Sequence, residues 1–341
     1  MELDELYELI DNQPLSKVFE TYPAADNFLR NNRLDDIDRS LPLIDGLKKI
    51  DPLILEEFDL TPADYVCELA EYIAMLPANR ESPAELGELM ICPGVDKDGR
   101  PEQAVLVLHP GEVVSLVGPT GSGKSRLLGD IECLAQGDTP SKRKIMLDGR
   151  FPGEEERMAL SCSLIALLSQ NMNFVADLTA AAFLRLHAES RGRAESDALA
   201  EACVTYANAL SGESFEASTR LTQLSGGQSR ALMIADAALI SDSPIILIDE
   251  IENAGINREK AVSMLINEQK AVLISTHDPL LALSASRRAV MKNGAISVIL
   301  TPSAEETALL PEIRRMDERL TALRNRLRNG EQLGVEKREA R

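Results

Sequence analysis

Gly118-Pro119-Thr120-Gly121-Ser122-Gly123-Lys124-Ser125 fits the phosphate-binding pattern G-x-x-x-x-G-K-[ST] at every fixed position. The apolar run 112–117 before it predicts a buried strand, and residues 125–128 after it open a helix. Glycines let the backbone wrap around an anion, so that N–H groups and the helix N-terminus face phosphate oxygens. Lys124 would then reach the β- and γ-phosphates, and the Ser125 hydroxyl would ligate Mg²⁺. A glycine-rich turn without a ligand would need neither the Lys124 nor the Ser125 side chain, so we interpret the stretch as a nucleotide-binding site.

The length and composition of the chain restrict its class. At 341 residues, with 44% of them hydrophobic, the chain is long enough for two or three domains with real cores. A net charge of −19 argues against a protein that holds nucleic acid on a basic surface, so we expect no nucleic-acid partner. The acidic start does not resemble a secretory signal, and no apolar run is long enough to cross a bilayer. These features predict a cytoplasmic protein without direct membrane insertion.

The cysteine and histidine side chains are too dispersed to indicate a metal centre. The five cysteines occur without C-x-x-C pairs, which predicts reduced and mostly buried thiols. The three histidines lack ligand spacing, so we expect no metal site built by the protein alone.

Residues 1–82 differ from the rest and form the first predicted domain. They hold 19 acidic and 7 basic side chains, and seven of the twelve aromatic residues of the chain. Disordered acidic tails are poor in aromatic residues, so we expect a folded all-α module. Prolines cut it into short helices, and Thr61-Pro62 predicts a helix N-terminus. We expect this module to dock a protein partner; the alternative is a generic helical cap on the neighbouring domain.

From residue 104 onward, apolar strands alternate with helices, which is typical of a parallel sheet covered by helices. The strands are predicted at 104–108, 144–147, 164–168, 245–248 and 272–276. Three of them deliver polar residues at their carboxyl ends: Gln170, the pair Asp249-Glu250, and His277. The stretch Leu224-Ser225-Gly226-Gly227-Gln228 lies between the first and second of these.

This order of motifs resembles the ATP-binding cassette (ABC) family: phosphate loop, glutamine loop, LSGGQ signature, acidic strand end and switch histidine. The resemblance covers about residues 88–300. It implies an α/β fold of the P-loop NTPase cassette type, with a mostly parallel sheet flanked by helices, in a domain 83–301. A helical subdomain is expected at about 171–230. ATP and Mg²⁺ are the implied ligands, and ATP hydrolysis is the implied activity.

The polar strand ends have chemical roles in such a site. Asp249 can hold Mg²⁺ directly or through water, and Glu250 is placed to orient or deprotonate the attacking water. Gln170 would sense the γ-phosphate or the metal, and His277 would hydrogen-bond the γ-phosphate. The expected metal ligands are therefore Ser125, Gln170 and Asp249, and the expected catalytic residues are Glu250, His277 and Gln170.

The signature stretch offers a second anion site. Ser225, Gly226 and Gly227 present N–H groups and a hydroxyl ahead of a helix that is expected to start near Gln228. The family resemblance implies that this stretch binds the γ-phosphate held by another protomer. Two copies would then enclose two ATP molecules head to tail, and one signature per chain predicts an ATP-dependent homodimer.

The sequence departs from the family pattern at two places: the loop that contacts the other protomer, and the residue that stacks on the adenine ring of ATP. Where the family commonly reads Asp-Glu-Pro-Thr-Ser-Ala-Leu-Asp, residues 249–256 read Asp-Glu-Ile-Glu-Asn-Ala-Gly-Ile. The aspartate of the loop that contacts the other protomer is lost, and Asn253 or Asn257 is a candidate substitute. No aromatic residue occurs between Tyr72 and Phe151, so the usual adenine-stacking residue is missing.

Residues 302–341 form a predicted C-terminal helical tail. Its apolar residues keep a 4-3-4-3-4 spacing: Leu309, Ile313, Met316, Leu320, Leu323 and Leu327. We expect this stripe to pack on the parent domain, with a free coiled coil as the alternative.

Three functional classes compete for an ATPase of this kind. We favour a soluble ATPase that drives conformational change in a protein partner, because the acidic module is atypical of transporter subunits. The alternative is the ATP-binding subunit of an ABC transporter, peripheral at the inner face of the membrane, whose permease is a separate chain. A DNA-handling cassette is the third class, and the acidic balance argues against it.

Overall fold

The computed structural model describes residues 3–22, 25–32, 34, 37–50, 61–75, 86–169, 174, 176–193, 195–250 and 256–333. The chain divides into two compact units. The first comprises Met1–Leu86 and Asn173–Asp242, and the second comprises Gly87–Met172 and Ser243–Arg341. The sequence-based boundaries at residues 82 and 301 stay predictions.

A six-stranded sheet forms the centre of the second unit. Its order is β5-β6-β7-β3-β8-β9, and all neighbouring strands are parallel except β8 and β9, which form an antiparallel hairpin. The predicted parallel sheet is confirmed, and β6, β7 and β3 are almost wholly buried, as strands covered on both faces must be. The strands span Val113–Val117 (β3), Ile165–Leu168 (β5), Ile245–Asp249 (β6), Ala271–Ser275 (β7), Arg287–Lys292 (β8) and Ala295–Leu300 (β9).

A second sheet of three antiparallel strands has the order β2-β1-β4. Its strands are β1 (Leu89–Cys92), β2 (Leu106–Leu108) and β4 (Lys144–Leu147). The strand predicted at 144–147 is confirmed, whereas the strand predicted at 104–108 starts two residues later.

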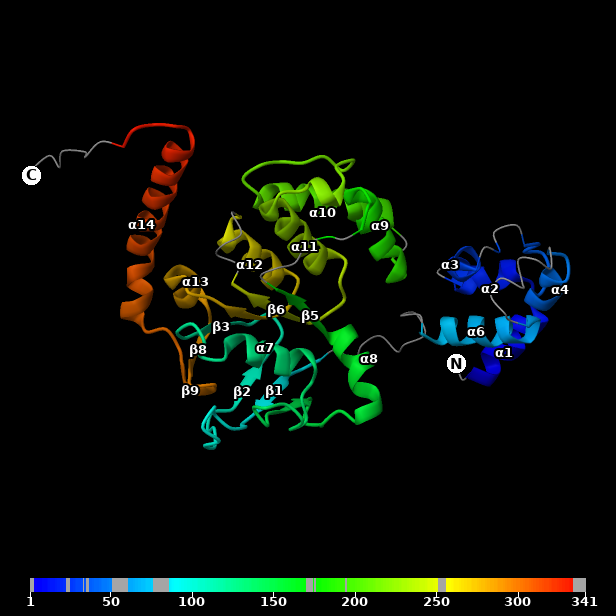
Figure 1. Ribbon diagram of the computed structural model, residues 1–341, viewed down its shortest axis with the longest axis horizontal. Coiled ribbons are helices and arrows are strands. Elements are labelled where there is room, and N and C mark those ends of the chain that lie inside the picture. Colours follow the sequence, from blue (N-terminus) through cyan, green and yellow to red (C-terminus); the bar gives the residue numbers. More distant parts are fainter. Residues whose placement is uncertain are drawn as a thin grey trace, which may run out of the picture. The chain divides into compact units, whose positions relative to one another are not determined.

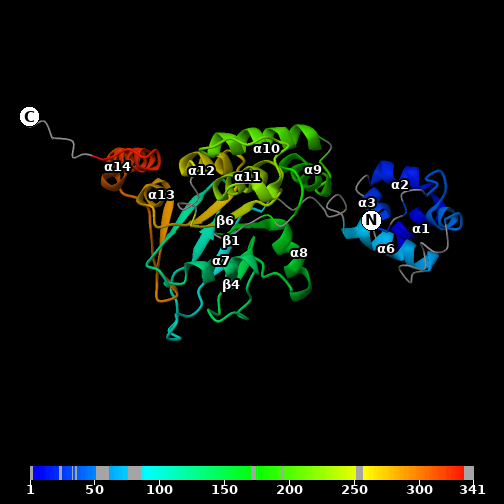
Figure 2. The ribbon, with the colours of Figure 1, turned by 45° about the horizontal axis from the view of Figure 1, so that its top comes forward.

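Helices of the second unit cover both faces of the large sheet. In both ribbon views, α7 lies on one side of the sheet and α12 and α13 lie on the other (Figures 1 and 2). No helix within the described ranges is both long and apolar enough to cross a membrane. The helices are α7 (Lys124–Glu132), α8 (Glu154–Leu164), α12 (Arg258–Asn267), α13 (Pro279–Ser284) and α14 (Ala304–Arg328).

The helical subdomain belongs to the first unit. It contains α9 (Ala180–Ser190), α10 (Ser196–Leu210), the 3-10 turn η2 (Leu221–Gln223) and α11 (Gly226–Leu239), and α10 packs on both α9 and α11. Of the five cysteines, only Cys203 on α10 is fully buried, and burial raises the pKa of its thiol to about 12. The expectation of mostly buried thiols was therefore wrong, because Cys67, Cys133 and Cys162 are exposed.

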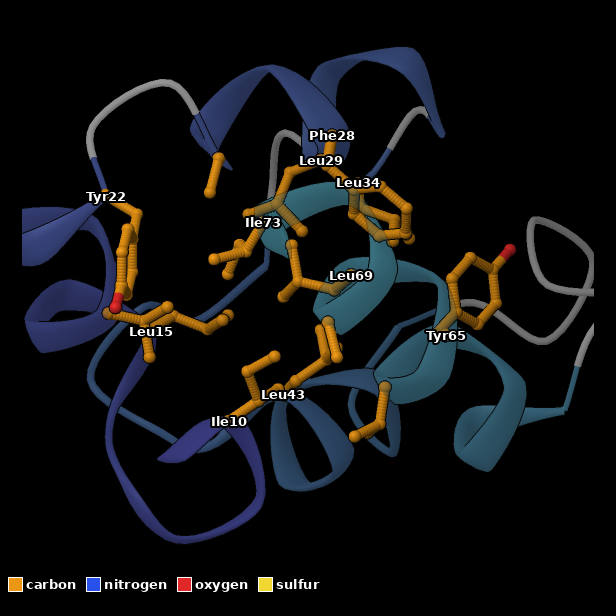
Figure 3. Packing of buried hydrophobic residues seen from close by; sticks show 14 of the residues in the cluster. Ile10, Leu15, Tyr22, Phe28, Leu29, Leu34, Leu43, Tyr65, Leu69 and Ile73 are labelled. Carbon is orange, nitrogen blue, oxygen red and sulfur yellow. The ribbon is translucent and has the colours of Figure 1, made fainter. Parts of the chain in front are cut away.

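The N-terminal module packs a core of its own. Its helices are α1 (Leu3–Asn12), α2 (Leu15–Thr21), α3 (Asp26–Asn31), α4 (Leu43–Leu47) and α6 (Pro62–Met75). Leu69 and Ile73 of α6 are fully buried, and side chains from the other helices converge on them (Figure 3). The predicted helix start is confirmed: Thr61 Oγ1 accepts the Asp64 N–H at 3.3 Å, and the Asp64 carboxylate accepts the Thr61 N–H at 2.7 Å.

Candidate active site

The phosphate loop connects β3 to α7, as its pattern predicts. The strand ends at Val117 and the helix begins at Lys124. Gly123 caps this helix with a φ of 105°, which is a left-handed conformation. A Cβ atom on Gly123 would lie 2.9 Å from the Cα of Gly294, so the loop needs a glycine here for space as well as for its backbone angle.

Two segments that are distant in sequence hold the phosphate loop from outside. The Gly294 N–H, in the turn between β8 and β9, donates to the Ser122 carbonyl at 2.7 Å. The Lys97 ammonium donates to the Gly121 carbonyl at 2.6 Å, and the Lys97 N–H donates to the Asn293 carbonyl at 2.9 Å. Sequence analysis missed Lys97 and Gly294, because no local pattern links them to a loop more than twenty residues away.

A buried ionic network fixes the helix behind the loop. The Arg143 guanidinium donates to Glu102 at 2.8 and 3.0 Å and to Asp130 of α7 at 3.1 Å, and all three side chains are at most 1% exposed. The same guanidinium donates to the Gly294 carbonyl at 2.6 Å. Removing one member of such a buried network typically costs about 3–5 kcal/mol, because a charge is left without its partner. The network therefore ties α7 to the turn that holds the loop.

The order of the strands brings the polar strand ends together. Strand β7 lies between β3 and β6, so the residues after all three strands meet at one edge of the sheet. The Lys124 ammonium donates to the Gly118 carbonyl at 2.9 Å and lies 3.2 Å from Nε2 of His277. This Nε2 lies 3.3 Å from the Glu250 carboxylate. Three predicted site residues from three different loops thus form one continuous contact.

Glu250 has an unusual backbone conformation. Its φ is 51°, in the left-handed region, and its N–H donates to the Ser275 carbonyl of β7 at 3.0 Å. For a residue with a side chain this conformation costs roughly 1–2 kcal/mol. Strained residues of this kind cluster at active sites, where the surrounding structure imposes them. Here the turn directs the carboxylate toward His277.

Ser125 and Asp249 form an oxygen pair that fits a hard cation. The Ser125 hydroxyl donates to the Asp249 carboxylate at 2.9 Å. Hydroxyl and carboxylate oxygens are the donors that Mg²⁺ prefers, and Mg²⁺ is usually held by one or two protein groups together with substrate phosphates. The described ranges contain no cluster of three or more His, Cys, Asp or Glu side chains that would hold a metal by itself. This donor set therefore fits a magnesium ion that arrives with a nucleotide.

The signature stretch begins α11. Ser225 caps the helix: its hydroxyl accepts the Gln228 N–H at 3.3 Å, while the Gln228 side chain accepts the Ser225 N–H at 2.8 Å. Ser225 and Gly226 are exposed. The helix starts at Gly226, two residues before the predicted start, so the N–H groups of its first turn face an accessible helix N-terminus.

Of three further residues predicted for the site, two lie outside the described structure and one lies within it. Gln170, the expected glutamine-loop residue, and Asn253 lie outside the described residues. Asn257 is described, and its side chain caps α12 by accepting the Lys260 N–H at 3.0 Å. This oxygen is therefore already engaged within its own chain.

Known proteins that resemble this chain are ATP-binding proteins, as the geometry of the site suggests. A family model described as ABC transporter matches residues 102–253. An uncharacterized ABC transporter ATP-binding protein of Methanocaldococcus jannaschii is 49% identical over 250 residues, which cover 73% of this chain and 95% of that protein. The chain belongs to the ABC transporter family of ATP-binding proteins. The predicted family and fold class are thus confirmed, and this cassette binds ATP and is an ATP hydrolase.

Other relatives match a smaller share of this chain. The macrolide export ATP-binding/permease protein MacB of Mannheimia succiniciproducens is 31% identical over 198 residues, which cover 55% of this chain and 30% of that protein. A dimeric structure of a bacterial ABC transporter cassette aligns with a TM-score of 0.50 at 25% identity, over 63% of this chain and 99% of that chain. A solved ATP-binding subunit of an ABC transporter aligns with a TM-score of 0.51 at 21% identity, over 62% of this chain and 89% of that one.

Proposed function

We propose that this cassette hydrolyses Mg-ATP in a site completed by a second copy, within a head-to-tail dimer. The observation that supports this most strongly is the continuous contact among Lys124, His277 and Glu250. The Ser125–Asp249 pair, between the first turn of α7 and the end of β6, supports it as well. The Lys124 ammonium, the Glu250 carboxylate and a pair of metal-ligand oxygens thus lie together at the carboxyl ends of parallel strands. Nucleotides bind at this end of the sheet in such folds.

The phosphate loop would hold the β- and γ-phosphates. Its residues 118–125 supply backbone N–H groups and the Lys124 ammonium, which has three donors. Ser125 and Asp249 would hold Mg²⁺, with Gln170 as a further ligand. When bound, the ion would neutralise charge on the phosphate oxygens. The loop requires little rearrangement for this role, because Lys97, Gly294 and the Arg143 network already fix its backbone.

Glu250 and His277 would act on the attacking water and the γ-phosphate. The Glu250 carboxylate is an acceptor, so it would orient the water and take its proton. His277 lies between the Lys124 ammonium and this carboxylate, at 3.2 and 3.3 Å, and would hydrogen-bond a γ-phosphate oxygen. The strained turn at Glu250 keeps the base in place before the substrate binds.

The signature of a second copy would complete the site. The Ser225 hydroxyl and the N–H groups of Gly226 and Gly227 lie at an exposed helix N-terminus, a position that favours an anion. Gln228 supports this end by closing the capping box. A solved bacterial cassette with a similar fold is dimeric, which supports a dimer here.

We further propose that ATP turnover drives a protein partner docked by residues 1–82. The module has a self-contained core and a strongly acidic composition, which suits a basic protein surface. A second candidate is a transporter subunit. It is supported by the relatives, an ABC transporter ATP-binding protein and a macrolide export ATP-binding/permease protein. In that case the partner is a permease on a separate chain.

Deleting residues 1–82 tests the docking role. Because the buried cluster of the module lies wholly within residues 6–73, we expect the truncated chain to keep its ATPase rate within about twofold. It should lose the partners that the full chain captures from lysate, and this capture should weaken as salt rises. Mass spectrometry of the captured proteins separates a permease from other partners.

The outcome for the stability of the truncated chain decides between docking and capping. A truncation that aggregates or loses many degrees of thermal stability would support a structural cap and contradict the docking role. Capture that is unchanged by the deletion would contradict it as well.

A further inference from the structure

The C-terminal helix α14 leaves most of its apolar stripe exposed. None of its residues is buried, and Leu309, Met316, Leu320 and Leu327 are 49–58% exposed. Ile313 and Leu323 are half-buried, and α14 packs on α13 of the same unit. The expectation that this stripe packs on the parent domain therefore holds only for part of the stripe. Pro311 lies on the opposite side of the helix from the stripe, so the proline does not interrupt it.

The attachment of α14 to its own unit uses a neighbouring flank. Arg288 pairs with Glu306 at 2.8 Å and Arg314 pairs with Glu259 at 2.7 Å. Arg258 pairs with Asp317 at 2.8 Å. These polar contacts occupy one side of the stripe, and the C-terminal half of the helix extends past α13 (Figure 1). The four exposed leucine and methionine side chains of the stripe and its other flank therefore remain accessible to a second helix. On that flank Arg326 pairs with Glu331 of the same chain at 2.8 Å, a surface ion pair that a second helix can replace.

The charges along this other flank are segregated. Glu305, Glu312, Arg319 and Arg326 recur every seven residues, each at the same position beside the apolar stripe. The first two are acidic and the last two are basic. A second copy of the same helix that runs antiparallel would place its basic half opposite the acidic half of the first, on both sides of the two-fold axis.

A parallel pair would place like charges together. In a parallel coiled coil each residue of this flank faces the residue five positions later in the partner helix. Glu312 would then face an aspartate at position 317, and Arg319 would face an arginine at position 324. Both contacts are repulsive. The one attractive contact, Arg326 with a glutamate at position 331, lies past the end of the helix at Arg328, so the sequence of α14 favours the antiparallel orientation.

We propose that α14 is a dimerisation helix, which pairs antiparallel with α14 of a second copy of this chain in the absence of nucleotide. The apolar stripe provides the contact area. The separate acidic and basic halves of the flank determine which partner binds and in which orientation. Such a pair keeps two cassettes at a high effective concentration between rounds of ATP binding, so the second contact becomes intramolecular.

The test is sedimentation velocity of the full chain without nucleotide, with two charge-reversal variants. Glu305→Arg with Glu312→Arg makes the flank all basic, and Arg319→Glu with Arg326→Glu makes it all acidic. We expect the parent to dimerise and each variant alone to dimerise about tenfold more weakly or not at all, because like charges then meet. An equimolar mixture of the two variants should dimerise again, because basic flanks then meet acidic ones.

The matched control is Glu318→Arg with Asn325→Arg, which changes the charge of α14 on the face away from the stripe. It should dimerise like the parent, and circular dichroism should show parental helix content in every variant. A nucleotide-free parent that stays monomeric at tens of micromolar would overturn the proposal. So would variants that dimerise like the parent, or a mixture that stays monomeric; the stripe would then bind another protein or another part of its own chain.

Discussion

Replacing Glu250 with glutamine is expected to stop ATP turnover while ATP remains bound. The amide has nearly the same shape as the carboxylate, so the contact with His277 and the backbone turn at φ 51° can persist. It cannot accept a proton from the attacking water, and the loss of a general base typically costs about 10²- to 10⁴-fold in rate. Steady-state phosphate release should fall by that factor, while calorimetry should show an ATP affinity within a few-fold of the parent.

Glu268→Gln is the matched control for this substitution. Glu268 is exposed and follows the end of α12, so the same chemical change there should leave the rate unaltered. If Glu250→Gln turned over ATP at close to the parental rate, another group would have to be the base. A variant that lost ATP binding together with turnover would show that Glu250 maintains the site rather than acting on the water.

Replacing Lys124 with alanine is expected to weaken ATP binding itself. The ammonium is almost buried, and it is held by the Gly118 carbonyl at 2.9 Å close to His277. A hydrogen bond to a charged group contributes about 1.5–3 kcal/mol, which corresponds to roughly a ten- to hundred-fold change in affinity. The dissociation constant for ATP, measured by calorimetry, should rise by at least that factor.

Lys260→Ala on α12 is the control, since this lysine is exposed. It should leave nucleotide affinity unchanged. Thermal unfolding of Lys124→Ala separates a lost ligand contact from a damaged loop. An unchanged ATP affinity in a well-folded Lys124→Ala protein would contradict the assignment of the phosphate loop.

The parts of this fold that depend on local pattern could be predicted from sequence. Strands β3, β6 and β7 are short apolar runs bounded by glycine or polar residues, and each was predicted within about two residues. The polar strand ends could be assigned because their order matches a known family. Their meeting point follows from topology, since parallel strands expose their carboxyl ends at one edge.

The parts that depend on contacts distant in sequence could not be predicted. Lys97 supports Gly121, and Arg143 joins two carboxylates and a hairpin turn, but each of these residues looks ordinary in its own segment. The left-handed turn at Glu250 is imposed by β7 rather than by the residue itself. The apolar stripe of α14 was predicted correctly as a stripe, yet spacing alone does not tell which surface covers it.

If a phosphate loop and a signature from two different copies form one hydrolytic site, two inactive variants should complement each other. The decisive measurement is ATP hydrolysis in an equimolar mixture of Lys124→Ala and Ser225→Arg proteins. Each variant alone should be inactive, because both of its sites lack one half. A mixed dimer regains one intact site, so random pairing should restore about a quarter of the parental rate. A mixture as inactive as its components, or full activity of Ser225→Arg alone, would show that the two copies do not share a hydrolytic site.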